Sequence, residues 1–139
     1  MIREDVLRSI VDNALMEMES CGLLIGVFRE LYVEVLEHRS AGNILGSRYE
    51  FEIDPRDVIE AYNNARSRGL EIVGIYHTHI GYPPIPSTKD IEGMRLWPIP
   101  WLIISLPERE KTAWMLCNER LVGLEIILDI SRGGGQAVA

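Results

Sequence analysis

The segment from residue 77 to residue 90 brings together side chains that could bind a metal ion. His77 and His79 are separated by one residue, and Ser87 and Asp90 follow within the next eleven. A zinc ion that takes part in catalysis commonly has three protein ligands from histidine, aspartate or glutamate, with water in the fourth position. His77, His79 and Asp90 are therefore candidate ligands of a zinc ion.

The strand predicted just before this segment would aim both histidines the same way. Residues 71–76 form an apolar run that predicts a buried strand, which delivers His77 at its end. Side chains alternate between the faces of a strand, so His77 and His79 leave the same face and can reach one ion. The alternative is a pair of surface histidines that only form hydrogen bonds. Three prolines in the loop 81–86 limit the freedom of the unfolded chain and would help to hold the site rigid.

Ser87 and Asp90 have a second interpretation. The sequence Ser-x-x-Asp also resembles a capping box, in which Ser87 begins a short helix and Asp90 occupies its third position. The Ser87 hydroxyl could serve the helix backbone and the site together. The two roles compete for Asp90, because a carboxylate that binds a metal has little freedom to bond back to the cap.

A hydrolytic metal site also needs a group that takes up and returns a proton, and a carboxylate can do so. Glu17 and Glu19 precede the apolar run 21–28, which predicts another buried strand. Glu19 stands just before that strand and could be held at the edge of the sheet beside the metal. The alternative is that Glu19 is only a charge at the end of the first helix. Glu17 is assigned to the solvated face of that helix.

The remaining pattern predicts one α/β domain over residues 1–130, with a mixed sheet and helices packed against it. Helices are predicted over residues 2–18, over 55–68 with Asp54 as N-cap, and from 87 to about 98. Alternation and apolar runs predict strands over residues 21–28, 31–36, 49–53, 71–76, 101–106, 112–117 and 121–128. The tail, residues 131–139, contains three consecutive glycines and is predicted to be disordered.

The composition of the chain limits which kinds of partner and which cellular location are expected. The chain has 139 residues and a net charge of −7, which argues against nucleic-acid binding because that needs a concentrated basic face. The first fifteen residues carry three acidic groups and do not form a signal peptide, and no apolar run is long enough to cross a membrane. A cytoplasmic location is expected. Cys21 and Cys117 lie in apolar surroundings and are interpreted as buried small hydrophobic residues, with a disulfide as the alternative.

Together these residues resemble the JAMM (MPN+) metalloprotease signature, which is a distant glutamate followed by His-[Ser/Thr]-His, seven residues, and Ser-x-x-Asp. Glu19 and the segments 73–79 and 87–90 match that signature, and the resemblance spans about residues 2–128. One position departs from it. The family usually has proline after the second histidine, where this chain has Ile80, so the loop that follows is expected to differ in path or contacts.

The resemblance implies a fold similar to cytidine deaminase, with a mixed, curved sheet between helices in three layers. It implies a zinc ion bound by His77, His79 and Asp90, with Glu19 as general acid and base. Ser87 would help to stabilise the scissile carbonyl oxygen as it becomes an oxyanion. The implied reaction is hydrolysis of an isopeptide or peptide bond after the C-terminal glycine of a ubiquitin-like or sulfur-carrier protein. The enzyme could be a homodimer.

Other functions stay open at this point. A non-catalytic MPN-type scaffold would bind ubiquitin-like partners, but such relatives lose one or more of the metal ligands that this chain retains. A branch linked to DNA repair shares the metal motif, but the net charge of −7 counts against it. The glycine-rich tail is similar to the ends of ubiquitin-like modifiers and could enter another molecule's active site.

Overall fold

An eight-stranded sheet forms the middle layer of the computed structural model, which describes residues 1–130. The strands are β1 (Ile2–Arg3), β2 (Cys21–Phe28), β3 (Val33–Ala41), β4 (Glu71–Ile80), β5 (Trp101–Leu106), β6 (Lys111–Cys117), β7 (Arg120–Leu124) and β8 (Leu128–Asp129). Their order in the sheet is β7-β6-β5-β4-β2-β3-β1-β8. The central strand β4 pairs antiparallel with β2 and parallel with β5, which confirms the predicted mixed sheet.

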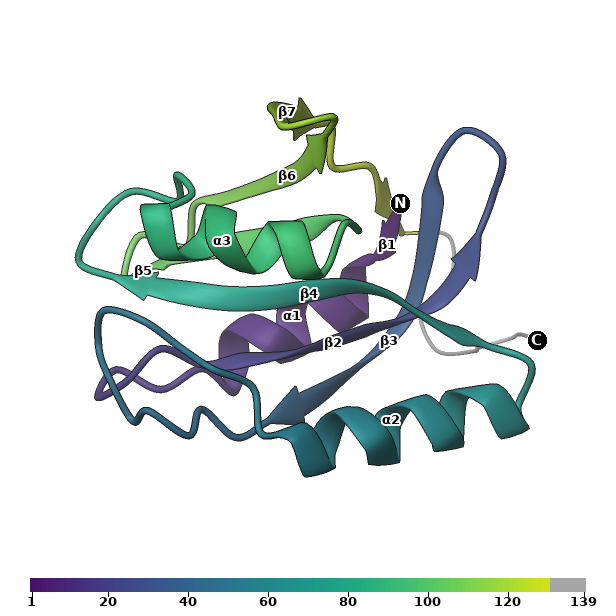
Figure 1. The fold of residues 1–139 in the computed structure, drawn as a ribbon, viewed down its shortest axis with the longest axis horizontal. Coiled ribbons are helices and arrows are strands. Elements are labelled where there is room, and N and C mark those ends of the chain that lie inside the picture. The colour runs from purple at the N-terminus through teal and green to yellow at the C-terminus, as the bar shows by residue number, and fades with distance from the viewer. Residues whose placement is uncertain (131–139) are drawn as a thin grey trace.

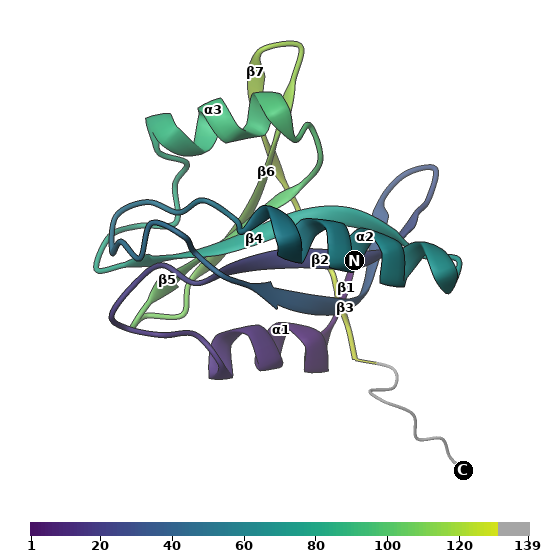
Figure 2. The same ribbon diagram turned by 60° about the horizontal axis from the view of Figure 1, so that its bottom comes forward.

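Helices cover both faces of this curved sheet, as Figures 1 and 2 show. One face is covered by α1 (Glu4–Asp12), and the other by α2 (Pro55–Ser67) and α3 (Thr88–Leu96). The helix residues that enter the two cores are mostly apolar and lie at helical spacing: Val6, Leu7 and Ile10 from α1, Ala61 and Ala65 from α2, and Met94 from α3. The three-layer α/β fold expected from the sequence is therefore confirmed.

The second predicted helix begins and ends as its sequence indicates. The Asp54 side chain accepts a hydrogen bond from the backbone of Arg56, and Pro55 occupies the first helical turn. At the other end Gly69 has a φ of +73°, a conformation that glycine adopts without a steric penalty. This helix is followed directly by β4, so its exact end fixes where the histidine strand starts.

The first helix is shorter than its apolar periodicity predicts. It ends at Asp12, and residues 13–20 cross to the start of β2 without continuing it. Polar bonds replace the helical ones there: Leu15 donates its backbone N–H to the Ser20 hydroxyl, and Arg48 donates to the carbonyl of Met16. The prediction of a helix over residues 2–18 is therefore wrong beyond Asp12, and also at Ile2–Arg3, which form β1.

The strand predicted over residues 49–53 is also wrong, because a side chain takes over its backbone bonds. The Asn43 amide oxygen accepts from the backbone N–H groups of Leu45 and Glu52. Its amide nitrogen donates to the carbonyls of Glu19 and Glu50. A single bridge between Asn43 and Ile53 is what remains of sheet pairing in this segment.

The last predicted strand is divided in two. Residues 121–128 were expected to form one strand, but β7 and β8 lie at opposite edges of the sheet, and residues 125–127 connect them. Three residues span at most about 14 Å, far less than the width of a flat eight-stranded sheet, so the curvature of the sheet must bring its two edges close together. The apolar alternation continues through this connection because Ile126 packs against the core on the α1 face.

Three further expectations concern the cysteines, the membrane and the tail. Both cysteines are free. Cys21 is buried as expected, whereas Cys117 is exposed, which corrects the prediction for Cys117.

Within the part of the chain that the structure describes, no helix is both long and apolar enough to cross a membrane. The predicted disordered tail, residues 131–139, lies outside the described residues.

Substitution of Gly26 by alanine tests the close pairing of β2 with β3. Gly26 lies at a shift in their register, and a Cβ atom there would meet the backbone oxygen of Glu34 at 1.8 Å. Because backbone must move to make room, Gly26→Ala is expected to lower the free energy of unfolding by about 3 kcal/mol in urea denaturation. Gly123→Ala is the control, since its Cβ would meet the Trp114 ring at 3.7 Å. Equal stability of the two variants would contradict this account.

Candidate metal centre

His77 and His79 lie on one face of β4, inside the molecule. Their side chains are 0% and 1% exposed, and they share the face that α2 and α3 cover. Thr78, between them, accepts a hydrogen bond from the backbone of Ser20 at 2.8 Å and so fastens β4 to the segment before β2. The predicted common direction of the two imidazoles is confirmed. The strand extends further than predicted, through both histidines to Ile80.

Asp90 faces both histidines from the first turn of α3. Its Oδ1 lies 3.1 Å from His77 Nε2, and its Oδ2 lies 3.1 Å from His79 Nε2. The two Nε2 atoms are 3.2 Å apart. Ligand atoms about 2.0–2.1 Å from one tetrahedral zinc ion are about 3.3 Å from each other. The donor types and their separations therefore fit a single metal ion, and the three residues form a group that could hold one.

Each imidazole ring is held in its orientation by a different neighbour. The Nδ1 atom of His79 lies 2.8 Å from the carbonyl of Pro83, which assigns the proton to Nδ1 and leaves the Nε2 lone pair free for a ligand bond. His77 instead stacks on Phe51, with ring centroids 4.4 Å apart, and contacts the edge of Trp101 at 5.8 Å. Both rings thus present Nε2 to the same point.

The capping box and the metal site share Asp90, contrary to the expectation that the two roles compete. The Ser87 hydroxyl accepts from the backbone N–H of Asp90 at 3.0 Å, and Asp90 Oδ2 accepts from the backbone N–H of Ser87 at 2.9 Å. The carboxylate can do both because Oδ1 and the second lone pair of Oδ2 remain directed at His77 and His79. The cap therefore orients the ligand instead of displacing it.

Two of the three candidate ligands, Asp90 and His77, are in the protonation states that bind a metal. Burial alone would raise the pKa of Asp90, but hydrogen bonds from His77 and His79 outweigh it and hold that pKa well below the usual range. Burial lowers the pKa of His77. At neutral pH Asp90 is an anion and His77 a neutral imidazole, which are the forms that coordinate metals. Burial would also lower the pKa of His79, but its hydrogen bonds with Asp90 and the Pro83 carbonyl outweigh it and raise that pKa, so a metal ion that binds must displace a proton from His79.

Glu19 lies beside this centre and is not a charge at a helix end. It is 1% exposed, and its backbone N–H and C=O are bonded to Ser47 and Asn43. Its Oε2 accepts a hydrogen bond from the Tyr82 hydroxyl, whereas Oε1 has no hydrogen-bond partner among the described residues. Burial raises the pKa of Glu19 to about 7. Glu17 is exposed, as predicted, but it lies beyond the end of α1 and not on a helix.

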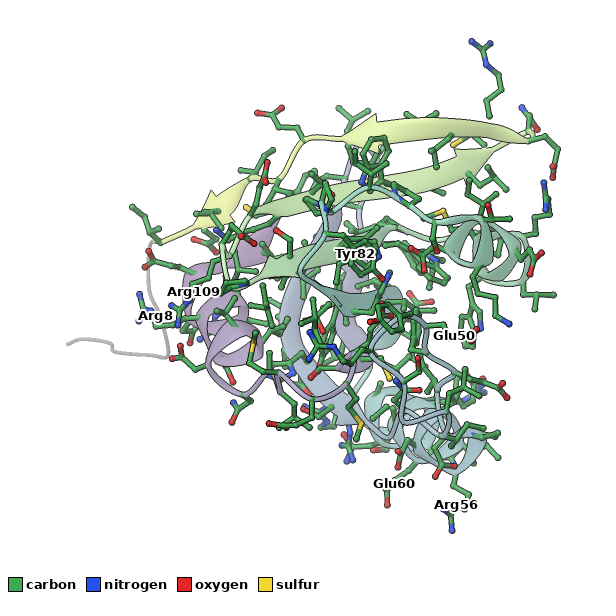
Figure 3. All side chains as sticks on the ribbon, turned by 90° about the vertical axis from the view of Figure 1, so that its left-hand side faces the viewer. Arg8, Glu50, Arg56, Glu60, Tyr82 and Arg109 are labelled. Carbon is green, nitrogen blue, oxygen red and sulfur yellow. The ribbon has the colours of Figure 1, made fainter. Side chains whose placement is uncertain are left out.

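Three aromatic residues line the centre that reasoning from the sequence missed: Phe51, Tyr82 and Trp101. Tyr82 lies on the loop that follows β4, near the middle of the view in Figure 3, and its ring stacks on His79 with centroids 4.1 Å apart. The available signal was its place three residues after His79, in a loop that must turn back over the histidine strand. Nothing in the sequence indicated that Phe51 lines the centre, because residues 49–53 were predicted to form a strand.

Ile80 leaves the path of the chain toward Asp90 intact. It is buried at 4% exposure, and it ends β4 by pairing with Leu106 of β5. The turn follows at Gly81, which has a φ of +84° and donates its N–H to the Leu106 carbonyl. Ile80 is thus the last residue of β4, and the turn begins directly after it.

Comparison with known proteins gives consistent matches. A family model described as prokaryotic homologs of the JAB domain matches residues 3–117. The chain is 43% identical over 105 residues to a desampylase of Pyrococcus furiosus, which covers 76% of this chain and 71% of that protein. It is 32% identical over 68 residues to a probable TtuB-protein conjugate cleaving protease of Thermus thermophilus, covering 43% of this chain and 45% of that one.

A solved structure agrees with these matches. The solution structure of protein DSY2949 from Desulfitobacterium hafniense superposes with a TM-score of 0.82 at 27% identity, over 93% of this chain and 92% of that chain. The segment matched by the family model contains every residue of the JAMM signature noted above. The chain therefore belongs to the family of prokaryotic homologs of the JAB domain, which is of the JAMM/MPN+ type.

Proposed function

We propose that this protein is a zinc-dependent isopeptidase that releases a ubiquitin-like or sulfur-carrier protein by hydrolysis after its C-terminal glycine. The observation that carries the proposal is the convergence of His77, His79 and Asp90 on one point with a buried carboxylate, Glu19, beside them. The likeness to a desampylase and to a protease of TtuB conjugates supports this class of substrate.

His77, His79 and Asp90 would hold the zinc ion. When bound there, zinc would supply Lewis acidity that polarises a carbonyl and makes water easier to deprotonate. Glu19 would take the proton from the attacking water and return it to the leaving amine. A carboxyl whose pKa is raised to about 7 suits both steps, because its two protonation states are then comparable in population near neutral pH.

Ser87 would act on the substrate carbonyl oxygen. Its hydroxyl oxygen accepts from the Asp90 backbone N–H, so the hydroxyl proton stays free to be donated. A donor that is already oriented before the reaction stabilises developing negative charge at little cost in reorganisation. The capping box fixes the Ser87 hydroxyl at the edge of the centre.

The second candidate function is a scaffold that binds ubiquitin-like partners without cleaving them. The complete ligand set and the buried Glu19 favour the enzyme, because a scaffold needs neither. Zinc as the metal, a cytoplasmic location, homodimer formation and the lack of nucleic-acid binding stay predictions from the sequence.

Removal of the metal tests the proposed function. Purified protein is expected to contain one zinc ion per chain, and a chelator is expected to abolish cleavage of a reporter fused after the C-terminal glycine of a ubiquitin-like protein. Added zinc should restore the activity, since the chelator removes the group that polarises the carbonyl. Full activity in zinc-free protein would contradict the mechanism, and absence of bound zinc would favour the scaffold.

Substitution of Glu19 by glutamine tests the proton-transfer role. Glu19→Gln keeps the size of the side chain but removes its basicity, so kcat is expected to fall by about 100-fold or more while zinc content is unchanged. Glu17→Gln is the matched control, because Glu17 is exposed and two residues away. Normal turnover in Glu19→Gln would assign the base to another group.

The same variant makes a prediction about stability. The pKa of Glu19 rises from 4.5 to about 7 on folding, so the folded protein holds this proton more tightly and loses stability as pH rises through that interval. In metal-free protein, Glu19→Gln is expected to be more stable than wild type by about 3 kcal/mol near pH 8 and equally stable near pH 4. Urea denaturation in the presence of chelator measures this, and a difference independent of pH would refute it.

A further inference from the structure

Tyr82 is the one described side chain that bonds the Glu19 carboxylate and also contacts a metal-ligand ring. Its hydroxyl donates to Glu19 Oε2, and its ring stacks on His79 with an interplanar angle of 16°. The two contacts come from opposite parts of one rigid side chain. Tyr82 therefore links the candidate proton-transfer group to a candidate metal ligand.

The local sequence holds Tyr82 in this place from both sides. Before it, Ile80 is fixed in β4 and Gly81 makes the turn with a φ of +84°. After it, the carbonyl of Pro83 lies 2.8 Å from His79 Nδ1. The residues on either side of Tyr82 are thus anchored to the histidine strand, and the aromatic ring is pressed against His79.

The direction of the hydrogen bond follows from the chemistry of the two groups. Burial, together with the bond to Glu19, raises the pKa of Tyr82, so its hydroxyl stays protonated and is the donor. The remaining Glu19 oxygen, Oε1, has no partner among the described residues. A carboxylate held by one oxygen keeps the other free, in a fixed direction, to exchange a proton.

On the basis of the proposed function, we propose that Tyr82 is a positioning residue that sets the Glu19 carboxylate through its hydroxyl and the His79 ring through its own ring. The hydroxyl and the ring then have separate tasks. The hydroxyl governs the proton-transfer step, and the ring governs how firmly the metal ligand is oriented.

Two variants separate these tasks. Tyr82→Phe removes the hydroxyl and keeps the ring, so kcat is expected to fall about 10- to 100-fold with KM and zinc affinity within about twofold, since a hydrogen bond to a charged group is lost. Tyr82→Leu removes both and is expected to weaken zinc binding about tenfold as well. Tyr32→Phe is the control, because it removes a phenol hydroxyl from the distant hairpin between β2 and β3.

A double variant shows whether the hydroxyl acts through Glu19. In the Glu19→Gln background, Tyr82→Phe is expected to have no further effect on the residual kcat, because the proton-transfer step is already lost. An additional loss there would mean that the hydroxyl acts on the substrate or on the fold, and would overturn the proposal. Unchanged kcat in Tyr82→Phe alone would overturn it too.

A readout other than activity separates this proposal from the proposed function. The hydrogen bond from Tyr82 favours the charged form of Glu19, so Tyr82→Phe is expected to move the Glu19 carboxyl titration, followed by carbon NMR in the zinc-loaded chain, upward by about half a pH unit or more. If this shift occurs but no conjugate is cleaved by wild type, the proposed function fails and the positioning role stands. If wild type cleaves and the titration is unmoved, the positioning role fails alone.

Discussion

The structure depends on burying four mutually facing polar side chains in one place. His77, His79, Asp90 and Glu19 are each at most 5% exposed, and two imidazole nitrogens come within 3.2 Å of each other. Charged groups in such surroundings cost free energy unless they are bonded, and two carboxylates repel one another. The Ser87 cap, the Pro83 carbonyl and the Tyr82 hydroxyl each offset part of this cost. A divalent cation would balance the two negative charges.

These side chains meet because of the register of the central strands. Cys21 of β2 lies opposite His77 of β4, so the residues just before β2 reach the same end of the sheet as the two histidines. The loop after β4 then brings α3 back over that end, and Asp90 arrives with it (Figure 1). A shift of one residue between β2 and β4 would turn both imidazoles to the α1 face. The site is therefore a property of the sheet and not of the histidine motif alone.

Much of the fold and the ligand set could be predicted from the sequence, because both depend on short periodic patterns. The alternation of side chains along a strand predicted that His77 and His79 point the same way, and the N-cap residue Asp54 predicted where α2 begins. The sequence could not decide between cap and ligand for Asp90, since the answer depends on which lone pairs face inward. It also missed Tyr82, whose role depends on the approach of Glu19 across 63 residues of chain.

The sequence predictions that were wrong for the first helix and for residues 49–53 also failed because of contacts that periodicity does not reveal. At the end of α1 and in the irregular segment 42–54, side chains bond backbone groups: Asn13 bonds the Ser9 carbonyl in one case, and Asn43 bonds Leu45 and Glu52 in the other. Propensity and periodicity do not register such competition between side-chain and backbone partners.

The Asn43 bonds also bear on how this domain can diversify. They close the ends of the segment that carries Phe51, while Leu45 and Tyr49 at its outer part are 43% and 72% exposed. The Asn43 amide and two backbone hydrogen bonds, from Ile44 to Glu52 and from Asp54 to Gly42, hold the ends of the segment in place of a ladder of strand pairs. Its length is therefore not tied to the two-residue repeat of a sheet. The Ser47 carbonyl must keep its place because it accepts the backbone N–H of Glu19, but residues can be inserted or deleted beside it, near Leu45 or Tyr49, without shifting a strand. The wall of the metal centre is thus joined to a stretch of chain that is free to vary in length, as loops that adapt to different partners must be.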